Sequence, residues 1–156
     1  MPKQAASAAP QQAQTDSQET DATSRPLRKD QQRTLCAYGW ADTAKQQGKL
    51  DDYEIAVQSF AATLLRSGFA AAVSVLERSA DHRDGFALLL DNLAFYTLPG
   101  IAATMPPSEW PARVRGLADI GQYMQATREL IALLGWLRRA CRALGAEKAP
   151  QAEPTG

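Results

Sequence analysis

The feature that most constrains the fold is a stretch near the C-terminus in which apolar side chains recur every three or four positions. The stretch runs from about Arg115 to Leu144, and its stripe comprises Ile120, Tyr123, Thr127, Leu130, Leu134, Leu137, Cys141 and Leu144. This spacing matches the turn of an α-helix, so we predict one long amphipathic helix. Such a helix needs other elements to cover its apolar face, and it therefore sets the framework of the fold.

The composition of the remaining chain also favours helices. Ala (29) and Leu (17) far outnumber Val and Ile (four each), and β-branched residues favour strands whereas Ala and Leu favour helices. We predict an all-α, single-domain bundle of about five helices over residues 27–146, which largely excludes a parallel-sheet enzyme. Residues 1–26 and 147–156 are predicted to be disordered tails, because residues 1–24 are rich in Ala, Gln, Ser and Thr and lack aromatic residues.

Four shorter helices are predicted before the long one. The first spans Lys29 to Gln47, with Leu35, Tyr38 and Ala41 on its buried side and Trp40 off that side. The second has Asp51 or Asp52 as its N-cap and ends at Gly68. The third follows at once, which makes a tight corner of helix, glycine and helix.

The fourth helix carries an apolar stripe from Phe86 to Tyr96 and ends before Pro99. Four prolines then fall between Pro99 and Arg113. Since proline cannot continue the hydrogen-bond ladder of a helix, we predict a loop that includes Trp110.

The overall charge balance of zero hides a basic folded part. The chain has 17 basic and 17 acidic residues, but residues 25–146 hold 15 basic and 12 acidic ones. Twelve of the 17 cations are Arg, whose planar fork suits phosphates and carboxylates. On the long helix, a second face opposite the apolar stripe lies within about 40° of Arg128. It comprises Gly121, Arg128, Ala132, Gly135, Arg139 and Arg142.

This glycine and arginine face has two interpretations, because a helix-interior glycine costs about 1 kcal/mol relative to alanine. In the first interpretation, a partner helix or a nucleic-acid backbone comes close to this face, and the guanidinium groups bind its carboxylates or phosphates. Alternatively, the face is solvated and tolerates two glycines. Trp136, at its border, either covers a partner or packs under arginine stems, and Trp40 and Trp110 are open to the same two interpretations.

Few residues support catalysis. His82 follows Arg78 as R-x-x-x-H, whereas HEPN-type helical ribonucleases place four to six residues between Arg and His, so a small helical RNase is a minor alternative. Cys36 and Cys141 are too far apart for a zinc cluster or a disulfide framework, and we interpret them as buried thiols. Phosphate-binding glycine loops and C-x-x-C or H-E-x-x-H motifs do not occur. We predict no catalytic residue, no metal site and no cofactor.

The N-terminus and the uncharged stretches bear on localisation. The first large apolar residue after Met1 is Leu27, so no secretory signal is predicted. The longest uncharged stretch, residues 92–108, is broken by prolines and is shorter than the roughly 20 apolar residues of a membrane span. We expect a cytoplasmic protein without a membrane partner.

The segment Tyr123 to Ala140, YMQATRELIALLGWLRRA, resembles the C-terminal signature of the small, all-helical subunit of type III-B CRISPR effector complexes, the Cmr complexes. That signature is approximately Y-x-x-x-T-x-E-x-L-x-x-L-x-W-L-K-R. The segment Phe60 to Glu77 is similar to the family's helix, corner and helix, and the resemblance covers most of residues 30–145. The chain departs from the family at Arg138, where Lys is common, at Ser67, where Asn is frequent, and in its long polar N-terminal tail.

The resemblance implies a noncatalytic subunit of an antiviral RNA-guided ribonucleoprotein. In that family, copies stack head to tail as a minor filament beside the backbone subunits and the guide RNA–target RNA duplex. Cleavage of target RNA, DNA degradation and cyclic oligoadenylate synthesis belong to other subunits in that family, and the implied partners are the backbone and large subunits.

Two sets of site residues are therefore expected. Nucleic-acid backbone contacts, without base specificity, are assigned to Arg128, Arg138, Arg139, Arg142 and Arg66. Partner contacts are assigned to Gly135, Trp136, Trp40 and Trp110. The alternative is a helical protein-interaction module that uses the same arginine face for acidic proteins, with no nucleic acid nearby.

Overall fold

The computed structural model describes residues 28–102 and 105–148, with side chains as far as residue 146. The chain divides into two units, residues 1–32 and 33–156. In the first unit, the described residues 28–32 contain the first turn of a helix, where the Arg28 N–H donates to Gln31 Oε1 at 3.0 Å. The predictions for residues 1–26 and 149–156 lie outside the described residues.

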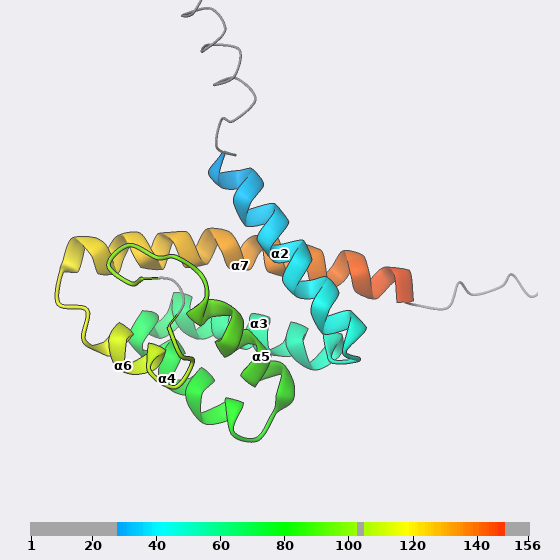
Figure 1. Ribbon diagram of the computed structural model, residues 1–156, viewed down its shortest axis with the longest axis horizontal. Coiled ribbons are helices and arrows are strands. Elements are labelled where there is room, and N and C mark those ends of the chain that lie inside the picture. Colours follow the sequence, from blue (N-terminus) through cyan, green and yellow to red (C-terminus); the bar gives the residue numbers. More distant parts are fainter. Residues whose placement is uncertain (1–27, 103–104, 149–156) are drawn as a thin grey trace, which may run out of the picture. The chain divides into compact units, whose positions relative to one another are not determined.

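The described part of the chain contains six α-helices and no β-strand, so the all-α prediction is confirmed (Figure 1). The helices are α2 (Lys29–Gln46), α3 (Leu50–Ser67), α4 (Phe69–Ala80), α5 (Asp84–Ala94), α6 (Trp110–Arg115) and α7 (Ile120–Lys148). An isolated bridge between Leu98 and Ile101 closes the turn after α5.

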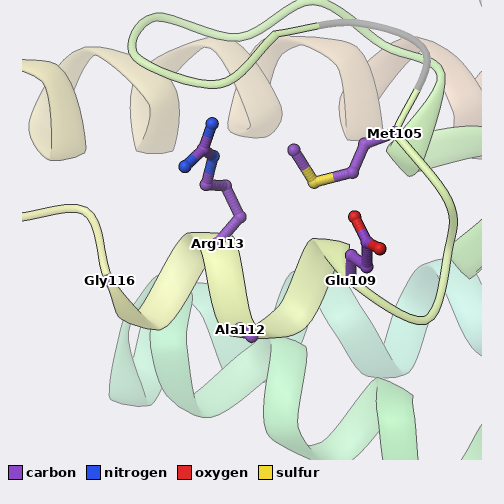
Figure 2. Close-up of a pocket in the computed structure, with 5 residues that line it drawn as sticks. All are labelled: Met105, Glu109, Ala112, Arg113 and Gly116. Atoms are coloured by element: carbon purple, nitrogen blue, oxygen red, sulfur yellow. The ribbon is translucent and has the colours of Figure 1, made fainter.

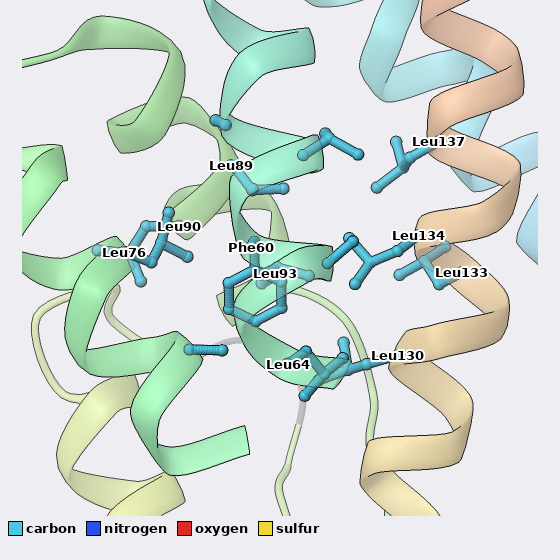
Figure 3. Packing of buried hydrophobic residues seen from close by; sticks show 14 of the residues in the cluster. Phe60, Leu64, Leu76, Leu89, Leu90, Leu93, Leu130, Leu133, Leu134 and Leu137 are labelled. Carbon is cyan, nitrogen blue, oxygen red and sulfur yellow. The ribbon is translucent and has the colours of Figure 1, made fainter. Parts of the chain in front are cut away.

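The helix at the centre of the core is α3, which packs against α4, α5 and α7. Figure 3 shows Phe60 and Leu64 of α3 among leucines that come from these three helices. On the α7 side the buried leucines are Leu130, Leu133, Leu134 and Leu137. Because each such side chain contributes about 1.5–3 kcal/mol when buried, this layer holds α7 in place.

The predicted corner of helix, glycine and helix is present. Gly68 has φ 92° and separates α3 from α4, and its N–H donates to the Leu64 carbonyl oxygen at 3.0 Å. A positive φ of this size is readily adopted only by glycine. The corner therefore depends on Gly68.

The prediction that Asp51 or Asp52 is the N-cap of the second helix is wrong. Helix α3 begins at Leu50, so its N-cap is Lys49, two residues before Asp51, and the Lys49 side chain makes no capping hydrogen bond. The Asp52 carboxylate instead accepts a hydrogen bond from the Gly85 N–H at 2.7 Å and pairs with Arg83. Asp52 thus stabilises the start of α5, whose first N–H groups have no partner within the helix.

The predicted buried side of the first helix is confirmed at Ala41 and wrong at Leu35 and Tyr38. Leu35 and Tyr38 are exposed, and the residues of α2 that enter the core are Ala37, Ala41 and Ala44. Trp40, placed off the buried side, packs against the core and meets the Tyr96 ring edge-on with centroids 5.9 Å apart. The small alanine side chains let α2 lie close to the core, and at this distance the Trp40 ring can contact Tyr96.

The long loop predicted over residues 99–113 contains a helix, α6. Pro111 lies in its first turn, where a proline removes no intrahelical hydrogen bond. Arg115 belongs to α6, so the long helix starts at Ile120 instead, and Asp119 Oδ1 accepts from the Gln122 N–H at 2.9 Å. Ile120, predicted on the core stripe, is exposed.

The core face of α7 follows the predicted stripe over its central turns. Leu130, Leu134, Leu137 and Cys141 are buried. Leu133 and Ala140, which are not part of the predicted stripe, are buried as well. Tyr123 and Leu144 lie half-buried at the two ends. The helix continues to Lys148, two residues into the segment predicted as a tail.

Candidate nucleic-acid interface

Helix α7 carries a basic surface. Arg128, Arg138, Arg139 and Arg142 are all exposed, and Leu130–Ala146 contains no acidic residue. Within the described part of the chain, none of these four arginines forms an ion pair. Since an unneutralised arginine is a strong donor to phosphate or carboxylate, the surface is available to an anionic partner.

The Trp136 ring orders one of these arginines. Trp136 is half-buried against the core, and the Arg139 guanidinium carbon lies 4.9 Å from its ring centroid. A cation–π contact at an exposed site is worth about 0.5–1 kcal/mol. Trp136 therefore reduces the freedom of Arg139, while the guanidinium remains at the surface.

The two glycines of the predicted face have different surroundings. A Cβ atom on Gly121 would come 3.1 Å from Asp119 Oδ1, so the carboxylate at the start of α7 crowds this position. Around Gly135 there is nothing within 4 Å of a Cβ atom. The described fold therefore gives a packing reason for Gly121 and none for Gly135.

Gly135 lies in a groove between α3 and α7. The groove has a volume of about 220 Å³, and it is lined by Ala61, Leu64, Leu65, Ile131, Leu134, Gly135 and Arg138. Leu65 is 68% exposed and Ile131 is 42% exposed. An apolar groove with one arginine differs in character from the rest of the basic surface, so Arg138 has surroundings that Arg139 and Arg142 lack.

The remaining predicted residues are distributed over other elements. Arg66 is exposed in the last turn of α3, next to the Gly68 corner. Trp40 is half-buried. Trp110 is fully buried and its ring packs against Phe69 with centroids 5.9 Å apart. The prediction that Trp110 contacts a partner is wrong, because the proline-rich segment folds inward as α6 and leaves the ring no exposed surface.

A cluster of polar side chains around Glu129 was not predicted. The Glu129 carboxylate accepts from Arg33 of α2 through both oxygens, at 2.9 and 2.6 Å, and from the Tyr96 hydroxyl at 2.6 Å. Burial, with the adjacent Glu129 charge, raises the pKa of Tyr96, so the hydroxyl stays protonated and donates. Glu129 thereby connects α7 to α2 and to the segment that follows α5.

Tyr123 joins two other elements. Its hydroxyl accepts a hydrogen bond from the Ala70 N–H at 3.0 Å, in the first turn of α4. Thr127 donates to the Tyr123 carbonyl oxygen at 2.8 Å. The family signature thus includes residues that hold α7 against the other helices. These residues are Tyr123, Thr127 and Glu129.

A second hollow, of about 420 Å³, lies beside α6 and is lined by Met105, Glu109, Ala112, Arg113 and Gly116. Figure 2 shows the side chains of Met105, Glu109 and Arg113 at this hollow. One carboxylate and one guanidinium flank it. In residues 28–102 and 105–148, no three His, Cys, Asp or Glu side chains lie close enough together to hold a metal ion.

The residues considered for nucleophilic chemistry lie apart from these surfaces. Arg78 is in the last turn of α4, and His82 follows in a turn; both are exposed. Cys36 and Cys141 are free thiols, half-buried and buried respectively. Burial raises the pKa of Cys36 to about 11 and that of Cys141 to about 12, so both remain protonated at neutral pH.

The fold and this surface define a small helical protein whose long C-terminal helix presents an exposed arginine face. Residues 29–144 match the family described as CRISPR-associated protein (Cas_Cmr5). This match spans most of the chain, so the protein belongs to that family, the small subunits of Cmr complexes. Among curated proteins and among solved structures, nothing matches the chain. None of the helices in the described residues is long and apolar enough to cross a membrane.

Proposed function

We propose that this chain is the noncatalytic small subunit of a type III-B CRISPR effector, a cytoplasmic RNA-guided antiviral ribonucleoprotein. Copies stack as a minor filament beside the backbone and large subunits and contact the guide RNA–target RNA duplex through its backbone. The observation that carries the proposal is that the family match includes α7, the helix whose exposed arginines have no acidic partner in the described residues.

The positions of the arginines suit a backbone contact. Arg139 and Arg142 lie within about 40° of Arg128 around α7, and the three arginines extend over about 21 Å along its axis. Arg66 adds a cation at the corner, and Arg138 adds one at the groove. Contacts of this kind position a protein on phosphates without reading bases, and sequence recognition is left to guide pairing.

The expected affinity of one copy is low. If a copy neutralises about three phosphates, the slope of about −0.7 per contact for single strands predicts roughly a twentyfold loss of affinity between 50 and 200 mM salt. Several copies in a row raise the effective concentration of arginines along the duplex. Nucleic-acid binding is therefore a property of the assembled complex.

The test is the double variant Arg139→Glu, Arg142→Glu in the reconstituted complex. We expect target RNA capture at 50 mM salt to fall by about tenfold or more, with a shallower salt dependence, because two phosphate contacts become repulsive. The matched control is Arg78→Glu, Arg113→Glu, which changes the charge equally at two exposed positions outside α7. Equal capture by the two double variants would show that the α7 face is only solvated.

Two alternatives are separated by further measurements. A protein-interaction module would bind its acidic partners regardless of generic RNA, whereas a nucleic-acid surface loses its ligand to such a competitor. Purification from the native host with sequencing of retained RNA distinguishes them as well, because a CRISPR subunit brings short guide RNAs with a shared 5′ tag. For the RNase alternative, His82→Ala in an RNase-free preparation would have to abolish cleavage.

A further inference from the structure

The outer face of α2 carries apolar side chains that the described fold does not cover. Leu35 is 63% exposed and Tyr38 is 38% exposed. Gly39 and Asp42 lie within about 60° of Leu35 around the helix, and a Cβ atom on Gly39 would meet nothing within 4 Å. This face combines two large apolar groups, a glycine that allows close approach and one carboxylate.

The groove between α3 and α7 has the complementary set. Its exposed apolar residues are Leu65 and Ile131, the uncrowded glycine is Gly135, and the single charge is the guanidinium of Arg138. Since a cavity of about 150 Å³ accommodates benzene, the groove volume of about 220 Å³ leaves room for a tyrosine or leucine side chain.

We propose that the outer face of α2 from a second copy of this chain fills this groove, with Asp42 paired to Arg138. The inference rests on the proposed function and names the contact through which copies stack. Asp42 accepts a hydrogen bond from Gln46 at 2.9 Å, and neither Asp42 nor Arg138 forms an ion pair within the described part of the chain. Each charge is thus available to the other copy.

The two surfaces lie on opposite sides of α7. Arg33 of α2 binds Glu129, and Glu129 is nine residues before Arg138, which places the two about 180° apart around the helix. A contact between different patches is heterologous, so it adds copies in one direction and forms an open filament unless the rotation closes a ring. Arg139 lies about midway between the two sides, so stacking leaves it uncovered in every copy.

The chemistry of the groove favours a protein occupant over nucleic acid. Four large apolar residues, Leu64, Leu65, Ile131 and Leu134, line it beside one guanidinium. A phosphate placed there would lose its hydration to apolar walls, and only Arg138 could offset that loss. An apolar helix face with a single carboxylate loses far less, because its apolar groups gain from burial.

The test compares self-association of nuclease-treated full-length variants by sedimentation velocity, from micromolar to several hundred micromolar protein at 50 mM salt. Gly135→Leu fills the groove, and we expect at least a tenfold weaker association together with an unchanged or raised melting temperature, since nothing crowds the site. Gly145→Leu on the same helix is the matched control, because a Cβ atom there also meets nothing within 4 Å.

A charge swap tests the pairing itself. We expect Asp42→Arg and Arg138→Asp each to weaken association about tenfold or more, and the double variant to return to within about threefold of the original protein. Arg142→Asp, exposed on the same helix but outside the groove, controls for the change in charge. Failure of the double variant to recover would overturn the pairing.

Three results would overturn the inference and leave the proposed function standing. The first is an original protein that stays monomeric over the whole concentration range. The second is a Gly135→Leu variant that associates normally but no longer joins the other subunits of the complex. The third is a Gly135→Leu variant that associates normally but loses RNA binding. The experiment with the Arg139→Glu, Arg142→Glu variant measures RNA capture, so its outcome does not depend on the outcome of the self-association test.

Discussion

Helices α2 and α3 have the same length, 18 residues, but they contribute differently to the fold. Helix α3 buries seven residues, which are Leu50, Tyr53, Ala56, Val57, Phe60, Ala61 and Leu64. Helix α2 buries three alanines. Equal length and equally regular hydrogen bonding therefore do not make two helices equal parts of a core, because the size of the buried side chains decides how much each contributes.

Helix α2 buries little side-chain volume, and a few specific contacts also hold it against the rest of the fold. Arg33 binds the Glu129 carboxylate, and Trp40 packs edge-on against Tyr96. We expect a helix held in this way to open before the core does. The outer face of α2 is the surface that we assign to contact with a second copy, so the helix combines weak anchoring with an interface.

The largest effect is expected in α3. Phe60→Ala removes a buried ring from the centre of the core and should lower the free energy of unfolding by about 3–5 kcal/mol. Leu35→Ala removes an exposed side chain of α2 and should change it by less than about 0.5 kcal/mol. Urea denaturation of both variants measures the two values, and similar losses would contradict the ranking of the two helices.

A smaller effect is expected from Glu129→Gln, which keeps the shape of the side chain and removes its charge. The bonds to Arg33 and Tyr96 weaken, and the free energy of unfolding should fall by about 1–3 kcal/mol. Hydrogen exchange should accelerate in residues 33–46 of α2 and stay slow in α3. Uniform acceleration in both helices would show that Glu129 stabilises the whole core and not α2 in particular.

The sequence predicts the elements whose signals are local. The apolar spacing of α7 specifies its core face at Leu130, Leu134 and Leu137. The helical patterns on both sides of Gly68 predict the corner between α3 and α4. The face of α2 could not be predicted in the same way, because Ala41 is shared by two apolar stripes. One stripe contains Leu35 and Tyr38, and the other contains Ala37 and Ala44. Only the surrounding helices decide that the smaller residues pack inward.

In the candidate site, too, the features with a local signal could be predicted and the nonlocal contacts could not. The exposure of Arg128, Arg139 and Arg142 follows from their position opposite the core stripe. Glu129 pairs with Arg33, 96 residues away, and no local sequence pattern predicts that contact. The groove is equally nonlocal, since Leu65 and Ile131 come together only when α3 packs along α7.

The same substitution should have opposite signs in the two regions. Gly39→Ala, at an exposed and uncrowded position inside α2, should raise the free energy of unfolding by about 1 kcal/mol. Gly68→Ala, at φ 92° and ψ 175° after α3, should lower it by about 1–3 kcal/mol, because only glycine adopts that conformation without strain. Thermal unfolding of both variants measures the difference, and two changes of the same sign would contradict it.

The two thiols report on the same contrast without altering the fold. Burial raises the pKa of Cys36 on α2 to about 11, so at pH 8 its thiolate fraction should be about a hundredfold below that of a peptide cysteine with an ordinary pKa near 9. Alkylation should be slow at pH 8 and should accelerate as the pH rises toward 11. Cys141 on α7, fully buried and with a pKa of about 12, should react more slowly still.

The way each thiol responds to denaturant separates local from global opening. If α2 detaches while the core stays folded, low urea should leave the alkylation rate of Cys36 nearly unchanged, because local opening exposes little surface. The rate at Cys141 should rise steeply with urea, as its exposure requires unfolding of the core around α3. Parallel slopes for the two thiols would mean that α2 opens only with the core, and its few buried alanines would then be sufficient anchors.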